Sequence, residues 1–243
     1  AGGAQDHVAI LCARDQHCGL FGYLPARVHR YIPWPRDYLF VIAVSGVEAT
    51  KTGNARDLYN RTSNSLRALL AAWNTTSGST HHSLQAALDA SAHAEPALRQ
   101  LATAGIGAYD GAYLGPRFEQ YLEESRSIVP GAAESLEAGD LLAFGNFVAR
   151  SQHLAETGLR NQVPETCALV STAKASGAVA ASAFGAGFGG AVWSMVTRDH
   201  ATEFLEAWRD RYLTSFGQHA QTCQFFLTAP GGPSGRCDRA ETA

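Results

Sequence analysis

The order of apolar and polar positions along the 243-residue chain predicts a mixture of strands and helices. Alternating or β-branched runs predict strands at residues 8–13, 19–24 and 38–44. From residue 55 the apolar spacing becomes helical, which is typical of an amphipathic helix. Its expected apolar face carries Leu58, Leu66, Leu69, Leu70 and Trp73.

The middle of the chain predicts further helices separated by polar or glycine-rich connections. Residues 74–83 read as a polar loop, and helical patterns resume at residues 84–90 and 96–102. Residues 105–116 are rich in glycine without periodicity, so we expect an irregular connection after which Pro116 starts a helix.

Asp140 follows a glycine and has the side chain of a helix N-cap, so a fresh helix is expected there. Its inward-facing residues are expected to be Leu141, Leu142, Phe144, Phe147, Val148 and Leu154.

The last third has a regular order of elements: helix, strand, tight loop, strand, helix, strand. The expected bounds are 164–175, 178–184, 185–190, 191–197, 199–216 and 223–229. Asp199 is the expected N-cap of the second helix, whose core face would carry Phe204, Leu205, Trp208, Tyr212 and Leu213. This order predicts an α+β fold, with helices on one face of an antiparallel, ferredoxin-like sheet.

The stretch "SAFGAGFGGAVWSMV" (residues 182–196) contains four glycines in six residues. A dinucleotide site needs a helix directly after such a loop, and a strand-like run follows here. A P-loop needs Gly-Lys-Ser/Thr, which does not occur. A tight hairpin needs only one or two glycines, so the surplus favours a loop pressed against a ligand or another backbone.

The composition limits the partners, the location and the metal sites that are expected for this protein. The net charge is −3 without a basic cluster, so no nucleic-acid partner is expected. There is neither an eighteen-residue apolar stretch nor a secretory leader, so we expect no membrane partner. Five scattered cysteines favour a reducing, cytoplasmic location over a disulfide framework. His81 and His82 lack a partner at ligand spacing, so no metal site is expected.

Several segments resemble the GHMP kinase superfamily in its galactokinase form. "FGAGFGGAV" (184–192) is similar to the third motif of that family, and residues 139–170 are similar to the segment before it. "RFEQYLEESRSI" and "CQFFLTAPGGPSG" resemble the upstream helix and the closing strand. The resemblance implies a two-layer GHMP kinase C-terminal domain whose glycine loop lies at the phosphate end of the active site. The implied loop residues are Gly185, Gly187, Phe188, Gly189 and Gly190.

The start of the chain, "AGGAQDH", resembles the segment that carries the catalytic base of galactokinases. The resemblance implies that Asp6 is this base and that Gly3 and Tyr59 line the sugar. Read without the family, Asp6 is expected to be a helix N-cap or surface carboxylate, whereas Tyr59 could equally be a core aromatic residue.

Two other family motifs, the arginine-bearing sugar motif and the serine-rich phosphate loop, do not occur in the chain. The resemblance therefore implies the C-terminal part of a longer kinase, whose missing N-terminal half would precede Ala1. We expect residues 1–37 to end the N-terminal kinase domain and residues 38–243 to form the C-terminal domain.

The implied function is ATP- and Mg²⁺-dependent phosphorylation of a monosaccharide at its anomeric hydroxyl, and no metal ligand is expected within this chain. Ser182 stands where the family has Lys or Arg, and Phe184 where it has Thr. Gln5 and His7 also differ from the family residues beside the base. These departures leave two alternatives open, a catalytically inactive sugar and ATP sensor and an interaction module.

Overall fold

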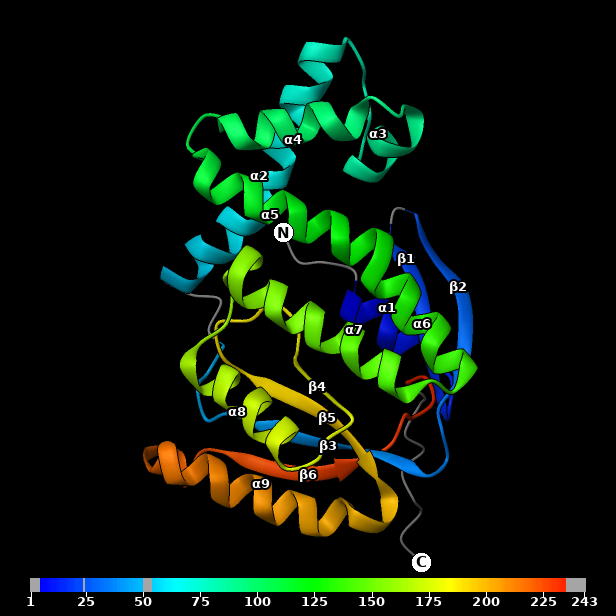
Figure 1. The fold of residues 1–243 in the computed structure, drawn as a ribbon, viewed down its shortest axis with the longest axis vertical. Helices are drawn as coiled ribbons and strands as arrows, with labels where there is room; N and C mark the ends of the chain where they lie inside the picture. The colour runs from blue at the N-terminus through cyan, green and yellow to red at the C-terminus, as the bar shows by residue number, and fades with distance from the viewer. Residues whose placement is uncertain (1–4, 24, 50–53, 235–243) are drawn as a thin grey trace, which may run out of the picture.

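The computed structural model describes residues 5–23, 25–49 and 54–234. Its central sheet has four antiparallel strands in the order β4-β5-β3-β6 (Figure 1). These strands are β3 (Tyr38–Val44), β4 (Ala180–Ala183), β5 (Ala191–Thr197) and β6 (Gln224–Thr228). With helices before β4 and between β5 and β6, this order is ferredoxin-like, so the predicted α+β fold class is confirmed, although helices cover both faces of the sheet rather than the one face expected.

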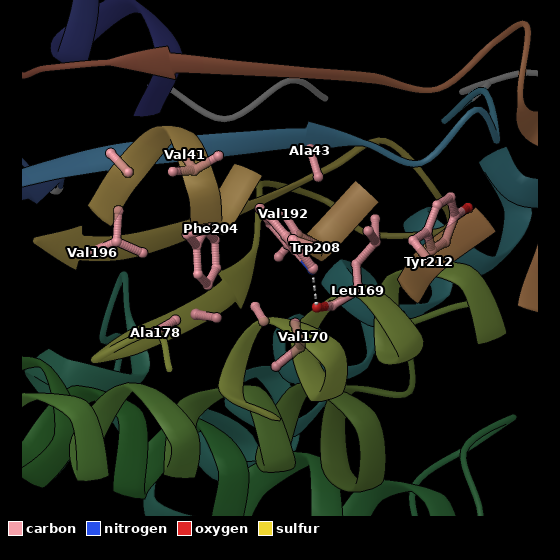
Figure 2. Packing of buried hydrophobic residues seen from close by; sticks show 13 residues of the cluster. Val41, Ala43, Leu169, Val170, Ala178, Val192, Val196, Phe204, Trp208 and Tyr212 are labelled. Atoms are coloured by element: carbon pink, nitrogen blue, oxygen red, sulfur yellow. Dashed lines mark hydrogen bonds between the residues drawn. The ribbon is translucent and has the colours of Figure 1, made fainter. Parts of the chain in front are cut away.

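One face of the sheet is covered by α8 (Pro164–Ala175) and α9 (Ala201–Ser215). Alternate β3 residues, Val41 and Ala43, point into this core and are fully buried. Trp208 lies at its centre (Figure 2), and its indole Nε1–H donates a 2.9 Å hydrogen bond to the carbonyl oxygen of Leu169. The indole N–H is therefore satisfied although the ring is buried.

The opposite face of the sheet packs on α6 (Val129–Ala138), on α7 (Leu141–Leu154) and on the end of a β-hairpin. The hairpin consists of β1 (His17–Tyr23) and β2 (Ala26–Pro33). Trp34, directly after it, packs on Phe40 of β3 with ring centroids 4.2 Å apart. The hairpin thus shares a core with the sheet.

A separate helical layer lies toward the top of the molecule in Figure 1. It is built from α2 (Asn54–Ser77), α3 (Leu84–Ala90), α4 (Ala94–Ala104) and α5 (Gly111–Glu123), which enclose a core of their own. Two π-helical turns, η1 (Glu124–Ile128) and η2 (Ala155–Leu159), follow α5 and α7. Short 3₁₀ turns occupy Arg198–His200 and Gly217–His219.

Two predictions about the first forty residues were incomplete or wrong. Residues 8–13 were expected to be a strand, but they lie mostly in helix α1 (Gln5–Cys12). Asp6 in the first turn favours a helix there, because its charge complements the helix dipole. Strand β2 was not predicted, since its first four residues are all exposed and no alternation of apolar and polar positions runs along its whole length.

Several helix details also differ. Asp140 caps α7 as predicted, whereas Leu142 is 79% exposed and Leu58 47% exposed, so neither faces a core. Asp199 lies within the 3₁₀ turn and α9 begins at Ala201 without a side-chain cap, so that N-cap prediction was wrong. The predicted polar loop at 74–83 begins late, because α2 continues to Ser77.

Helix α5 starts five residues before the predicted position. Asp110 is its N-cap and accepts a 2.8 Å hydrogen bond from the backbone amide of Tyr113. Pro116 therefore lies inside the helix, where it has no N–H to offer the carbonyl oxygen of Ala112. Arg160 supplies a donor instead, with Nη2 3.3 Å from that oxygen.

Candidate functional site

The glycine loop (residues 184–190) joins β4 to β5 and has an unusual backbone. Five of its residues have positive φ, between 60° and 124°: Gly185 (60°), Gly187 (80°), Phe188 (63°), Gly189 (124°) and Gly190 (86°). Phe188 is the only one with a side chain, and this conformation strains a non-glycine residue. The run of glycine is therefore required by the backbone geometry.

One side of the loop lies against Asn161, which is only 3% exposed. The amide of Phe188 donates a 2.5 Å hydrogen bond to the Asn161 carbonyl oxygen, and Asn161 Nδ2 donates to the carbonyl oxygen of Ala186 at 3.0 Å. A Cβ on Gly187 would lie 2.1 Å from the Asn161 carbonyl oxygen. No side chain fits at that position without movement of the backbone.

The other side of the loop lies against the segment after β3. The amide of Gly190 donates to the carbonyl oxygen of Val47 at 2.9 Å, and Ser45 donates its amide to Gly190 at the same distance. A Cβ on Gly189 would lie 2.8 Å from the Val47 carbonyl oxygen. The surplus of glycine is thus explained by close contact with two neighbouring backbone segments. Contact with another backbone is one of the two alternatives predicted from the sequence.

Four amides of the loop are left without a partner within the described structure. Those of Gly185, Ala186, Gly187 and Gly189 donate no hydrogen bond to any described residue. Neighbouring amides in left-handed conformations form concave sites for anions. The loop therefore has donors suited to phosphate oxygens.

Asn161 was not singled out from the sequence, although it holds the loop. Gln162 donates to its Oδ1 at 2.8 Å, and Thr166 at the start of α8 donates to Gln162 Oε1 at 2.9 Å. These contacts fix the amide orientation of Asn161. Its burial depends on tertiary contacts, so no local pattern marks it.

Ser182, at the position where the resembled motif has Lys or Arg, contacts α7. Its hydroxyl donates to Gln152 Oε1 at 3.2 Å, and the amide of Ala183 donates to the same oxygen at 3.0 Å. Gln152 is buried and donates its Nε2 to Glu156 at 2.8 Å. Hydrogen bonds through Gln152 thus connect β4 to α7.

The structure places Asp6 in the first turn of α1, after the capping position, with its side chain exposed. Burial, and next the negative charge of Asp6, raise the pKa of the Tyr23 hydroxyl. Tyr59 is half-buried on α2. Gly3 lies outside the described residues. The contacts described for the loop do not include Asp6 or Tyr59.

A cavity of about 390 Å³ lies beside the loop, and we call it the arginine cavity. It is lined by residues of α2, α5, η2 and the glycine loop: Leu58, Arg61, Thr62, Asp110, Ala112, Tyr113, Leu159, Arg160 and Phe188. Leu58 and Arg61 flank Tyr59, but Tyr59 and Asp6 are not among the described residues that line the cavity.

In the part of the chain that the structure describes, no three His, Cys, Asp or Glu side chains are grouped to hold a metal ion. In the same residues, no helix is both long and apolar enough to cross a membrane.

Three comparisons with known proteins bear on the family. Residues 132–213, from α6 to α9, match the family described as GHMP kinases C terminal. A galactokinase of Chloroflexus aurantiacus is 36% identical over 91 residues, which is 37% of this chain and 23% of that one. The chain contains a galactokinase-like GHMP kinase C-terminal region.

The fold of this GHMP region agrees with a solved structure. Lactococcus lactis galactokinase, determined in complex with galactose, superposes with a TM-score of 0.74 at 21% identity. The alignment covers 97% of this chain and 56% of that galactokinase. The chain thus spans just over half the length of that relative, and its matched segment spans about a quarter of the Chloroflexus protein.

Proposed function

We propose that this GHMP region belongs to a sugar kinase that transfers a phosphoryl group from ATP to the anomeric hydroxyl of a monosaccharide. The observation that carries the proposal is the glycine loop, with four amides that donate to no described residue, in a region whose family and fold are galactokinase-like. In this proposal residues 1–37 end the N-terminal kinase domain and residues 38–243 form the C-terminal domain. Besides the monosaccharide and ATP, the proposed partner of this region is an N-terminal kinase half. The proposed location of the protein is the cytoplasm.

Asp6 is the proposed base. Its exposed carboxylate can accept the proton of a sugar hydroxyl, or orient that hydroxyl toward the phosphoryl group, in a site completed by the N-terminal half. Gly3 would let the sugar ring approach the backbone, and Tyr59 would give the ring a flat apolar surface with a polar edge.

The loop residues Gly185, Gly187, Phe188, Gly189 and Gly190 support the phosphate end. The amides of Gly185, Ala186, Gly187 and Gly189, which donate to no described residue, suit phosphate oxygens, because Asn161 and Val47 hold the loop backbone on either side of them. ATP supplies the phosphoryl group when it is bound. Mg²⁺ would accompany ATP, but the described residues offer no ligand cluster for it, so we assign no residue of this chain to it.

The proposal is tested with the full-length protein, ATP and a panel of monosaccharides, by following ADP formation together with the sugar phosphate. Turnover on one of the sugars is expected. Binding of sugar and ATP without turnover would instead support the alternative of a catalytically inactive sensor. Absence of both binding and turnover would overturn both and favour an interaction module.

A further inference from the structure

The arginine cavity carries two guanidinium groups that form no ion pair with a carboxylate of the described residues. Arg61 comes from α2 and Arg160 from the turn after η2. The ion pairs found within the described residues use other arginines: Arg30, Arg99, Arg126 and Arg150. Two cations on one concave surface repel each other unless an anion lies between them.

The rest of the cavity holds these cations in place. The Arg61 guanidinium lies over the ring of Tyr113, 4.4 Å from its centroid, which is a cation–π contact. Arg160 donates Nε to the carbonyl oxygen of Thr157 at 3.2 Å and Nη2 to that of Ala112 at 3.3 Å. The Ala112 oxygen is available because Pro116 has no N–H. Two nitrogens of Arg160 thus donate hydrogen bonds, and Nη1 donates to no described residue and is left for a ligand.

Among the described residues that line the cavity, Asp110 has the one carboxylate, and this carboxylate already accepts a hydrogen bond. Its Oδ1 accepts the 2.8 Å hydrogen bond from the Tyr113 amide and caps α5. Counting Arg61, Arg160 and Asp110, the lining carries one net positive charge. The cavity is therefore suited to an anion.

The cavity also contacts the glycine loop through two routes. Phe188, held in its strained left-handed conformation, is one of the residues that line the cavity. Arg160 directly precedes Asn161, whose carbonyl oxygen and side chain hold the loop. Arg160 itself has φ of 55°, so the backbone at this junction is fixed in a conformation that a non-glycine residue rarely adopts.

We propose that the arginine cavity binds the phosphate group of a small phosphorylated molecule, and that binding stabilises the glycine loop through Phe188 and Asn161. A tetrahedral phosphate has enough oxygens to accept from two arginines on different elements, whereas a carboxylate is satisfied by a single arginine fork. A volume of about 390 Å³ also leaves room for a group of sugar size beside the phosphate. This regulatory site goes beyond the proposed kinase function.

The test uses inorganic phosphate as the probe and the full-length protein. Phosphate affinity is measured by calorimetry at constant ionic strength, and hydrogen exchange is followed in residues 184–190. Arg61→Gln and Arg160→Gln should each raise the dissociation constant roughly tenfold to a hundredfold, as expected for charge-assisted hydrogen bonds. Phosphate should slow exchange at the Phe188 amide in the wild type and not in either variant.

Arg67→Gln is the matched control, because Arg67 is also exposed on α2 but does not line the cavity. It should bind phosphate as the wild type does, and acetate should bind more weakly than phosphate. Tyr113→Phe keeps the ring and should preserve affinity, whereas Tyr113→Leu should lower it. Comparable thermal unfolding of all variants shows that they fold.

Three results would overturn the proposal: no phosphate binding, binding unchanged in both cavity variants, or an equal loss in Arg67→Gln. The last would indicate general screening of charge. None of these results depends on turnover. The phosphate-site proposal can therefore be overturned while the proposed kinase function holds, and the kinase function can be overturned while phosphate binding in the cavity holds.

Discussion

The backbone amide of Phe188 donates a 2.5 Å hydrogen bond to the carbonyl oxygen of Asn161. This contact joins the glycine loop to the segment before α8, across a sequence separation that no local pattern reveals. Because Phe188 has positive φ, the hydrogen bond helps to offset the strain of that conformation. The loop is therefore held by tertiary contacts, and we expect changes at its glycines to differ according to what each glycine faces.

Gly187→Ala should destabilise the protein more than Gly185→Ala. Both positions have positive φ, which costs an alanine about 1–2 kcal/mol. A Cβ at Gly187 would also lie 2.1 Å from the Asn161 carbonyl oxygen, whereas one at Gly185 meets no described atom within 4 Å. Overpacking should add about 1–3 kcal/mol at Gly187. Chemical denaturation of the three proteins measures the difference, and equal losses would show that the loop does not depend on contact with Asn161.

Gly145 and Gly115 form a second matched pair, in helices α7 and α5. A Cβ on Gly145 would lie 2.4 Å from the carbonyl oxygen of Val179, just before β4, so Gly145→Ala should separate α7 from the sheet and destabilise by about 1–3 kcal/mol. Gly115 has open space, so Gly115→Ala should stabilise by about 0.5–1 kcal/mol through helix propensity. Thermal unfolding should move in opposite directions, and a stabilising Gly145→Ala would contradict the close packing.

The sequence predicts the elements whose pattern is local. The bounds of β3, α8 and β5 agree with those expected, because apolar alternation and Pro164 at the first helical turn mark them directly. Residues 8–13 were misread because an apolar run of that length suits either a strand or a helix.

The candidate site likewise contains some features that the sequence predicts and others that it does not. The need for close approach at Gly187 and Gly189 follows from glycine density, and the structure names the neighbours as Asn161 and Val47. Those neighbours, and the cation–π pair of Arg61 and Tyr113, join segments that are distant in sequence. The roles assigned to Asp6 and Tyr59 stay predictions, as does the domain boundary after residue 37. Trp34 packs on Phe40 across that boundary, so the two parts share a core.

Tyr212→Phe should destabilise the protein at neutral pH. The buried hydroxyl of Tyr212 donates a 2.6 Å hydrogen bond to the carbonyl oxygen of Ser45, whose amide in turn donates to Gly190. Removing the donor leaves a buried carbonyl unsatisfied, which costs about 1–3 kcal/mol. Denaturation at pH 7 measures the loss, and Thr214→Val, which removes an exposed hydroxyl on the same helix, serves as a control.

The same substitution should alter the alkaline limit of stability. Burial, and next the negative charges of Glu165 and Cys223, raise the pKa of the Tyr212 hydroxyl in the folded protein. The neutral phenol therefore favours the folded state, and this contribution is complete below the unfolded pKa of about 10 and is lost as pH rises above it. The stability difference between wild type and Tyr212→Phe should shrink above pH 10. A difference that is constant from pH 7 to pH 11 would show that Tyr212 does not titrate differently on unfolding.

Asp6→Asn tests the proposed chemistry. The amide keeps the shape of the carboxylate but cannot accept a proton from the sugar hydroxyl, and Asp6 is exposed on the first turn of α1, so folding should be little affected. General-base contributions are typically about 10² to 10⁴ in rate, so kcat of the full-length enzyme should fall by about that factor. KM for the sugar should change much less, because an interaction made in the transition state is lost mainly from kcat.

Asp15→Asn, at an exposed position just after the same helix, is the control and should keep wild-type kinetics. The measurements are kcat and KM of the three proteins on the best sugar found, together with sugar affinity by calorimetry. An Asp6→Asn enzyme within about threefold of the wild-type kcat would mean that Asp6 is not the base, since even the low end of the expected range is a hundredfold. A wild-type protein that binds sugar without turnover, and whose sugar affinity alone changes in Asp6→Asn, would instead identify the sensor.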